Sequence, residues 1–200
     1  MDETGNLEYL STELLGTHGR HDDDLMPAID RLCARHSARP RDIARLAVSI
    51  GPGGYTSIRI ATATAKMLAE VTGACIAAVP SWRVAARFGP AGPTLVCLAS
   101  KNESAWAALV PGPGPLGLIT AADVLELKPA AVIADRFLPP PMREAALRIG
   151  ADVSEPIFAA ASLFEFAGPD AQTVDSLALL PLYPREAEAV SQWRRLHPPG

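Results

Sequence analysis

The sequence predicts an α/β protein, and two observations support this prediction. The first is a short apolar run, Leu46–Ile50, which breaks at a Gly-Pro-Gly-Gly turn and is followed by apolar residues at helical spacing through Thr72. This order of strand, tight turn and helix is typical of α/β folds. The second is the composition, with 48% hydrophobic residues and few aromatics. Two hundred residues are enough for one full domain or two small lobes.

The glycine turn has the residues that a strand needs to reverse into a helix. Such a reversal usually passes through positive φ, and Pro52 fixes φ beside the glycines. We expect Tyr55 at the apex of the turn and Arg59 in the first helical turn. Thr56 or Ser57 is expected to cap the helix by accepting a backbone N–H bond. The turn lacks both the Gly-Lys-Ser/Thr of a Walker A loop and the GxGxxG of a dinucleotide site, so alone it also fits an ordinary connection.

Charge, cysteine content and hydropathy narrow the class of protein. A net charge of −4 argues against broad electrostatic capture of nucleic acid. Cys33, Cys75 and Cys97 form no CxxC pair, so we expect buried reduced thiols rather than a disulfide or a metal site. No apolar run reaches the roughly 18 to 20 residues of a membrane span. The acidic start, MDETGNLEYL, lacks the regions of a signal peptide. A cytoplasmic protein without membrane contact is expected.

The remaining elements follow from hydrophobic spacing and from Gly and Pro positions. A helix beginning near Asp23 or Asp24 has acidic residues in its first turn and Arg35 in its last, as the helix dipole favours. His18 and His21 near three aspartates suggest metal ligands, but a solvated helix start is favoured because no further ligand stands at suitable spacing. The other expected elements are a strand within Asn6–Leu15, a stop at Gly73, a strand at Cys75–Val79, a helix at Ser81–Phe88, a hairpin of Thr94–Ala99 and Ala105–Val110 with a five-residue connection, a loop at Pro111–Pro115, a strand at Ala130–Ala134 and a helix at Glu144–Ile149.

One long stretch resembles a known family. Ser49–Ile60, SIGPGGYTSIRI, with ATAK at 63–66 and Leu68-Ala69, resembles the "GPGSFTGLR, then ATAKGLA" signature of the TsaB (YeaZ) family. The segment at 21–29 resembles the "HSExLLPxID" pattern of that family, and Pro181-Leu182-Tyr183 resembles its "PLYLR" segment. Members are non-catalytic dimerisation subunits of the bacterial machinery that puts a threonylcarbamoyl group on the adenosine beside the tRNA anticodon.

The resemblance implies a fold of two ribonuclease-H-like lobes, the actin-like ATPase fold. Residues 1–89 would form the first lobe, 93–175 the second, and 176–200 a C-terminal segment returning to the first. Family members begin with two strands around an Asp-Thr-Ser turn, and this sequence resembles that plan only from the following turn onward. We therefore expect an N-terminally truncated first lobe with an incomplete sheet. Without that turn, the first phosphate-binding loop of the ATPase class, no productive ATP binding by this chain alone is expected.

The resemblance also implies partners and a surface. The first helix and the 56–72 helix are expected to bind the catalytic subunit TsaD, with the ATPase subunit TsaE completing the complex and tRNA reached only through it. ATP or ADP is expected only at the interface of the complex, and no catalytic residue or metal ligand is predicted. The partner-binding residues predicted are Leu25, Met26, Ile29, Leu32, Ile58, Ala61, Thr62, Ala65, Leu68 and Ala69. The loop-signature residues are Gly51, Pro52, Gly53, Gly54, Tyr55, Thr56 and Arg59.

Two alternatives stay open. One is a homodimeric scaffold that uses the same helix face, because an apolar helix pair must be covered in some way. The other is a glycoprotease-type hydrolase or a small sugar-kinase-like ATPase. That enzyme would need a metal-ligand set or an intact phosphate loop, and the sequence shows neither these nor a Gly-x-Ser-x-Gly or HExxH motif.

Overall fold

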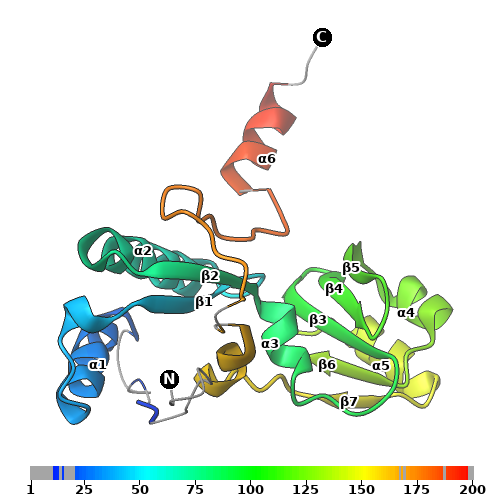
Figure 1. Ribbon diagram of the computed structural model, residues 1–200. Helices are drawn as coiled ribbons and strands as arrows, with labels where there is room; N and C mark the ends of the chain where they lie inside the picture. The colour runs from blue at the N-terminus through cyan, green and yellow to red at the C-terminus, as the bar shows by residue number, and fades with distance from the viewer. Residues whose placement is uncertain are drawn as a thin grey trace.

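The computed structural model describes residues 11–13, 15, 21–166, 168, 170–186 and 188–197. These residues form a two-stranded and a five-stranded β-sheet that lie side by side, each with helices against it (Figure 1). The strand predicted within Asn6–Leu15 falls largely outside the described residues, and positions 11–13 and 15 are neither helix nor strand. The expected truncation of the first lobe stays a prediction. Within the described ranges, no helix has the length and apolar character needed to cross a bilayer.

The two-stranded sheet confirms the predicted strand, turn, helix and strand. β1 (Arg45–Gly51) and β2 (Cys75–Pro80) are parallel, with Arg45 opposite Cys75 and Ser49 opposite Val79. The crossover between them is α2 (Tyr55–Thr72), which ends at Gly73 in the left-handed conformation, as expected for a glycine stop. The hydrophobic core between α2 and the two-stranded sheet contains Val48, Ala65, Ala69, Ile76 and Leu179.

The five-stranded sheet has the order β5-β4-β3-β6-β7. β3 (Thr94–Lys101), β4 (Ser104–Val110) and β5 (Gly114–Ile119) are antiparallel, whereas β6 (Ala131–Ala134) and β7 (Asp152–Ser154) run parallel to β3. The predicted five-residue hairpin connection is wrong: Lys101 pairs with Ser104, so only Asn102 and Glu103 lie between the strands. Asn102 provides the left-handed conformation, with φ 57°, that so short a turn needs.

The helices differ from the predictions mainly at their ends. α1 (His21–Arg35) begins slightly before the expected Asp23. α3 (Ser81–Ala86) ends before Phe88, and α5 (Pro140–Arg148) begins before Glu144 because proline is tolerated in a first helical turn. The sequence analysis missed β5, β7 and α4 (Ala121–Leu127), and β5 begins inside the loop predicted at Pro111–Pro115. The prediction of three buried thiols is wrong for Cys75, which is exposed; Cys33 is half-buried and Cys97 is buried.

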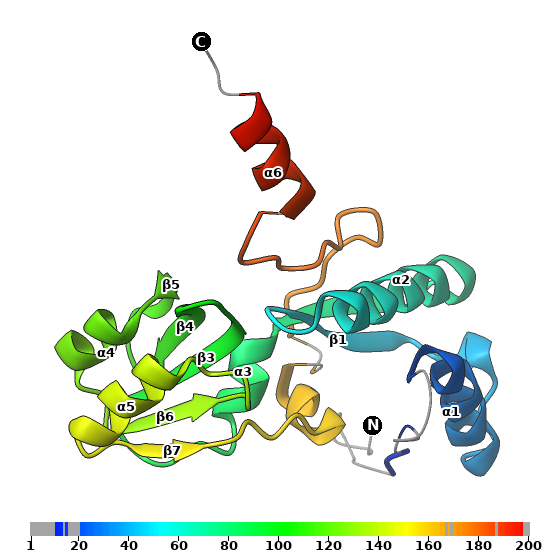
Figure 2. The same cartoon turned by 180° about the vertical axis from the view of Figure 1, so that it is seen from behind.

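The chain returns to the two-stranded sheet after β7, as the view from behind shows (Figure 2). A 3₁₀ segment, η2 (Ala160–Phe166), packs against β1 and β2, and Val174 forms an antiparallel bridge with Ile76. We call residues 175–186 the strap; it leads to α6 (Glu188–Leu196), which projects from the body of the molecule (Figure 1). The predicted lobe boundaries stay predictions, while these contacts show the chain back at the first sheet from Ala160 onward.

Candidate partner-binding surface

The glycine turn positions the start of α2. Gly51 has φ +110°, the positive value expected for a glycine in this turn. Gly51 and Pro52 are buried, whereas the residues from Gly53 to Ser57 are exposed. The predicted cap at Thr56 or Ser57 is wrong: the helix begins at Tyr55, Gly54 is the N-cap, and the N-cap makes no side-chain hydrogen bond. Gly54 provides the cap through its backbone, because its carbonyl accepts the amide of Ile58 at 3.0 Å.

The first turn of α2 is joined to the strap by a cluster of Tyr55, Arg59 and Tyr183. The guanidinium carbon of Arg59 lies 4.1 Å from the centre of the Tyr55 ring, and Arg59 Nε donates to the Tyr183 hydroxyl at 3.0 Å. Arg59 Nη2 also donates to the Tyr55 hydroxyl. The two rings lie 4.9 Å apart. Two predicted loop-signature residues thus contact a tyrosine from the predicted C-terminal segment, a contact that the sequence analysis did not anticipate.

Part of the predicted partner-binding set lies on the buried face of α2. Ile58, Thr62, Ala65 and Ala69 are 3 to 7% exposed. Ala65 and Ala69 pack in the core of the two-stranded sheet, and half-buried Ala61 packs against the same core. The helical spacing therefore identified a real apolar face, but this chain's own sheet covers it. These side chains are buried within the chain, and their predicted role in partner binding stays a prediction.

An exposed apolar flank remains on the other side of α2. Met67 is 52% exposed and Val71 is 80% exposed, and their spacing of four residues places them on the same side of the helix. Exposed Ala63 lies one turn earlier, and Leu68 from the predicted set is half-buried. The sequence analysis missed Met67 and Val71 because it chose the larger apolar face. A second apolar stripe outside the principal face was the signal that could have found them.

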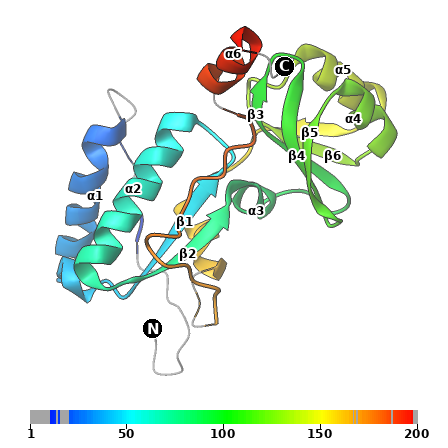
Figure 3. The same cartoon turned by 90° about the horizontal axis from the view of Figure 1, so that it is seen from above.

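α1 lies beside α2 and contacts it, as the view from above shows (Figure 3). Ala28 is buried, and the predicted residues Leu25, Ile29 and Leu32 are half-buried. Met26, also predicted, is 40% exposed. The segment before α1 is tied to it, because Glu13 Oε2 accepts Arg31 Nε at 3.1 Å and Glu13 also pairs with Arg35. Of the predicted residues on α1, Met26 is therefore the most accessible.

A cleft of about 370 Å³ opens beside the glycine turn, at the carboxyl ends of β1 and β2. Ligands of parallel sheets commonly bind at this edge. Its polar side chains are serines, and Ser49 Oγ lies 2.7 Å from Ser81 Oγ. Among the described residues the lining is otherwise apolar and contains no charged side chain: Ser49, Pro52, Gly53, Gly54, Ser57, Ile58, Ala61, Ser81, Val84, Phe158, Ala159, Ala160 and Leu163.

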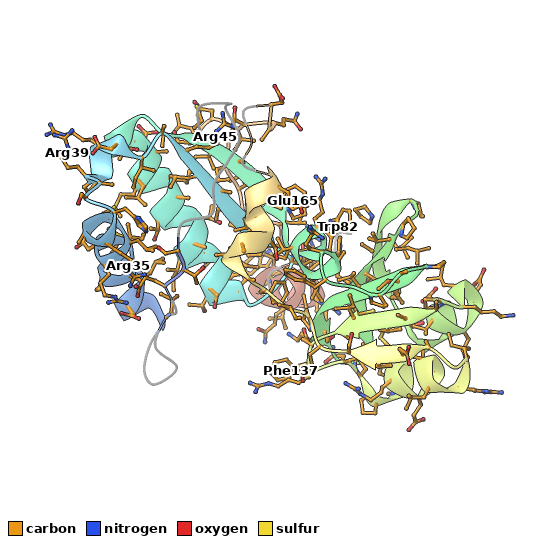
Figure 4. The ribbon with its side chains drawn as sticks, turned by 60° about the horizontal axis from the view of Figure 1, so that its bottom comes forward. Arg35, Arg39, Arg45, Trp82, Phe137 and Glu165 are labelled. Atoms are coloured by element: carbon orange, nitrogen blue, oxygen red, sulfur yellow. The ribbon has the colours of Figure 1, made fainter. Side chains whose placement is uncertain are left out.

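The charged side chains labelled in Figure 4 are not among the described residues that line this cleft. Arg35 and Arg39 lie at the end of the molecule farthest from the five-stranded sheet, while Trp82 and Glu165 lie near the junction of the two sheets (Figure 4). In the part of the chain that the structure describes, no group of three or more His, Cys, Asp or Glu side chains is arranged to hold a metal ion. The side chains of His21, Asp22 and Asp23 lie outside what the structure describes, as does His18.

Comparison with known proteins agrees with the sequence resemblance. Residues 16–105 match the family model of TsaD, tRNA N6-adenosine threonylcarbamoyltransferase. A solved structure described as an uncharacterized protein with similarity to peptidase YEAZ, from Pseudomonas aeruginosa, is similar with a TM-score of 0.57 and 16% identity, over 83% of this chain and 85% of that one. The structure of YeaZ from the same organism is similar with a TM-score of 0.51 and 14% identity, over 82% and 84%. In its fold, the chain is similar to YeaZ.

The structural likeness shows that the chain has the fold of YeaZ, the actin-like ATPase fold that the sequence resemblance implied. The structural likeness extends over most of both chains, so both sheets take part in it. The match to the TsaD family covers α1, the glycine turn and α2, and ends in β4. A comparison with curated proteins finds no match.

Proposed function

We propose that this YeaZ-like chain is a non-catalytic subunit of the bacterial machinery that makes threonylcarbamoyladenosine in tRNA, and that it binds a TsaD catalytic subunit through α2 and α1. The observation that carries the proposal is the exposed flank of Met67 and Val71 on α2. Exposed apolar side chains on a rigid helix are typical of interaction surfaces. The family match and the shared fold support the choice of partner.

The test is complex formation with TsaD from the same source, measured by size-exclusion chromatography with light scattering. Met67→Glu and Val71→Glu should each weaken the complex at least about tenfold, because a buried unpaired charge is costly. Leu147→Glu is the matched control. Leu147 is 62% exposed on α5, so its substitution should leave the complex unchanged.

Substitution at Ala65 cannot serve as this test, because Ala65 is 6% exposed within the chain's own core. Thermal unfolding of each variant separates lost binding from lost folding. If Met67→Glu and Val71→Glu fold normally and bind TsaD as well as the unchanged chain, this surface is not the interface.

A homodimer that uses the same flank is the second candidate. The exposed apolar side chains would be covered equally well by a second copy. Light scattering of the chain alone and with TsaD distinguishes the two. If the chain is a homodimer alone and forms a heterodimer when TsaD is added, the flank serves both in self-association and in TsaD binding. A chain that is monomeric alone excludes the homodimer.

We propose that ATP or ADP, TsaE and tRNA engage this chain only within the complex, and that the chain performs no catalytic step. The cleft beside the glycine turn supports this, because none of its described lining residues is charged and nucleotide phosphates require cations or a rich set of hydrogen-bond donors. Calorimetry should show no tight, nanomolar binding of ATP to the isolated chain, and the isolated chain should not hydrolyse ATP, whereas the assembled complex should bind it tightly. Tight binding or hydrolysis by the isolated chain would favour the kinase-like alternative.

A further inference from the structure

We propose that the chain binds a small phosphate-bearing ligand in a second cleft, between the tip of the β3–β4 hairpin, the strap and α6. This cleft encloses about 400 Å³, within the range of small-molecule sites. Three cationic side chains, Lys101, Arg185 and Arg195, line it together with Asn102, Leu118 and Glu186. The cleft shares no lining residue with the cleft beside the glycine turn.

Arg185 is the fixed cation of this cleft. Its Nη2 donates to the Ser104 carbonyl oxygen at 2.9 Å, to Ser104 Oγ at 3.0 Å and to the Lys101 carbonyl oxygen at 3.4 Å. All three acceptors are neutral, and Nε is buried without an acceptor in the part of the chain that is described. A half-buried guanidinium on neutral acceptors keeps an uncompensated charge. An anion in the cleft would compensate this positive charge through short, strong hydrogen bonds.

The acidic member of the lining is already engaged. Glu186 Oε1 lies 2.6 Å from Nη1 of Arg194, which neighbours Arg195 on α6. Among the described lining residues, three cationic side chains therefore accompany one carboxylate, and that carboxylate is paired with a cation outside the lining. The whole chain has a net charge of −4, so this concentration of cations is not one part of a generally basic surface.

The chemistry fits a phosphate or diphosphate on a small molecule better than a nucleic-acid backbone. Tracking a backbone requires a basic face that continues over several nucleotides. Here the cations surround a single cleft at the end of one hairpin. Leu118, 48% exposed on β5, offers an apolar surface for the organic part of such a ligand.

The experiment is calorimetric titration of the full chain with inorganic phosphate and pyrophosphate. Saturable binding is expected, with pyrophosphate the tighter ligand. Arg195→Gln should weaken pyrophosphate binding about tenfold or more, as expected for one lost hydrogen bond to a charged group. Glu186→Gln should not weaken it. Arg148→Gln, which removes the same charge from the exposed end of α5, is the matched control and should leave binding unchanged.

Two results would overturn the assignment. One is the absence of saturable binding of either anion, and the other is an equal loss in Arg148→Gln and Arg195→Gln, which would indicate attraction to overall charge alone. A short single-stranded RNA serves as a competing probe. If it binds at this cleft and pyrophosphate does not, the small-ligand class is wrong. Circular dichroism melts verify that the variants fold, and Arg195→Lys, which keeps the charge, should retain more binding than Arg195→Gln.

Discussion

Gly51 lies so close to the strap that a Cβ at this position would sit 2.7 Å from the carbonyl oxygen of Leu182. The same Cβ would lie 2.9 Å from Cδ1 of Ile58. The amide of Leu182 donates to the carbonyl oxygen of Ile50 at 2.7 Å, so the strap is hydrogen-bonded to the chain just before the turn. The glycine turn is therefore shaped both by its own positive φ and by a segment about 130 residues later in the chain.

Gly51→Ala should lower the free energy of unfolding by about 2 kcal/mol or more, because it adds a steric clash to left-handed strain. Gly73→Ala is the control. Gly73 also has positive φ, +77°, but a Cβ there meets nothing within 4 Å. Its cost should be only the conformational term, about 1 kcal/mol. Urea unfolding of both variants measures the difference, and equal losses would show that the contact with Leu182 is unimportant.

Leu179→Ala should destabilise the protein by about 2 to 4 kcal/mol. Leu179 belongs to the strap but is 1% exposed, in the core of the two-stranded sheet with Ile76 and Ala65. Leu177, two residues earlier, is 79% exposed, and Leu177→Ala should change stability by less than about 0.5 kcal/mol. Chemical denaturation measures both. Similar small effects would mean that the strap is not part of this core.

The sequence predicted the elements around the glycine turn well because their signals are local. Apolar spacing and the glycines at 51 and 73 were enough to define β1, α2 and β2. The same spacing shows which residues of α2 share a face, but not what covers it. Ala65 was therefore assigned to a partner, although the chain's own sheet and Leu179 cover it.

The missed elements and contacts have different physical causes. β5, GPLGLI, contains two glycines and a proline, so its composition indicates a loop. α4 has only seven residues, too few for a clear helical period. The contact of Arg59 with Tyr183 joins residues far apart in the sequence, and no local pattern reports such a contact. Local sequence patterns therefore predicted helices and strands, whereas packing between distant segments determines which side chains are exposed.

Cys97 and Cys75 should differ sharply in reactivity. Cys97 is 0% exposed in β3, and burial, with a smaller effect of the nearby Asp135 charge, raises the pKa of its thiol to about 12. The thiolate is the nucleophile, so Cys97 should stay unmodified by a thiol reagent near pH 8 until the protein unfolds. Cys75, exposed at the start of β2, should react in the native state. Peptide mass spectrometry before and after denaturation locates the label, and rapid native labelling of Cys97 would contradict its burial.

Asp135 and Asp123 should influence stability in opposite directions as pH changes. Burial raises the pKa of the Asp135 carboxyl, although its Oδ1 accepts the Phe137 amide at 2.9 Å. A raised carboxyl pKa costs stability as pH rises from the unfolded-state value, about 4, through the folded-state value. Asp135→Asn should therefore stabilise the protein at neutral pH, with the gain fading below about pH 3.

The ionised carboxylate of Asp123 has the opposite effect and stabilises the protein. The amide and the hydroxyl of Thr120 donate to Asp123 Oδ2 at 2.7 and 2.8 Å, at the start of α4, and lower the pKa of that carboxyl. Its stabilising contribution is complete above the unfolded-state pKa and is lost as pH falls through the folded-state value. Asp123→Asn should therefore destabilise the protein at neutral pH and converge with the unchanged chain in acid. Urea unfolding of both variants from about pH 3 to pH 7 gives the two curves, and effects of the same sign would refute the assignment.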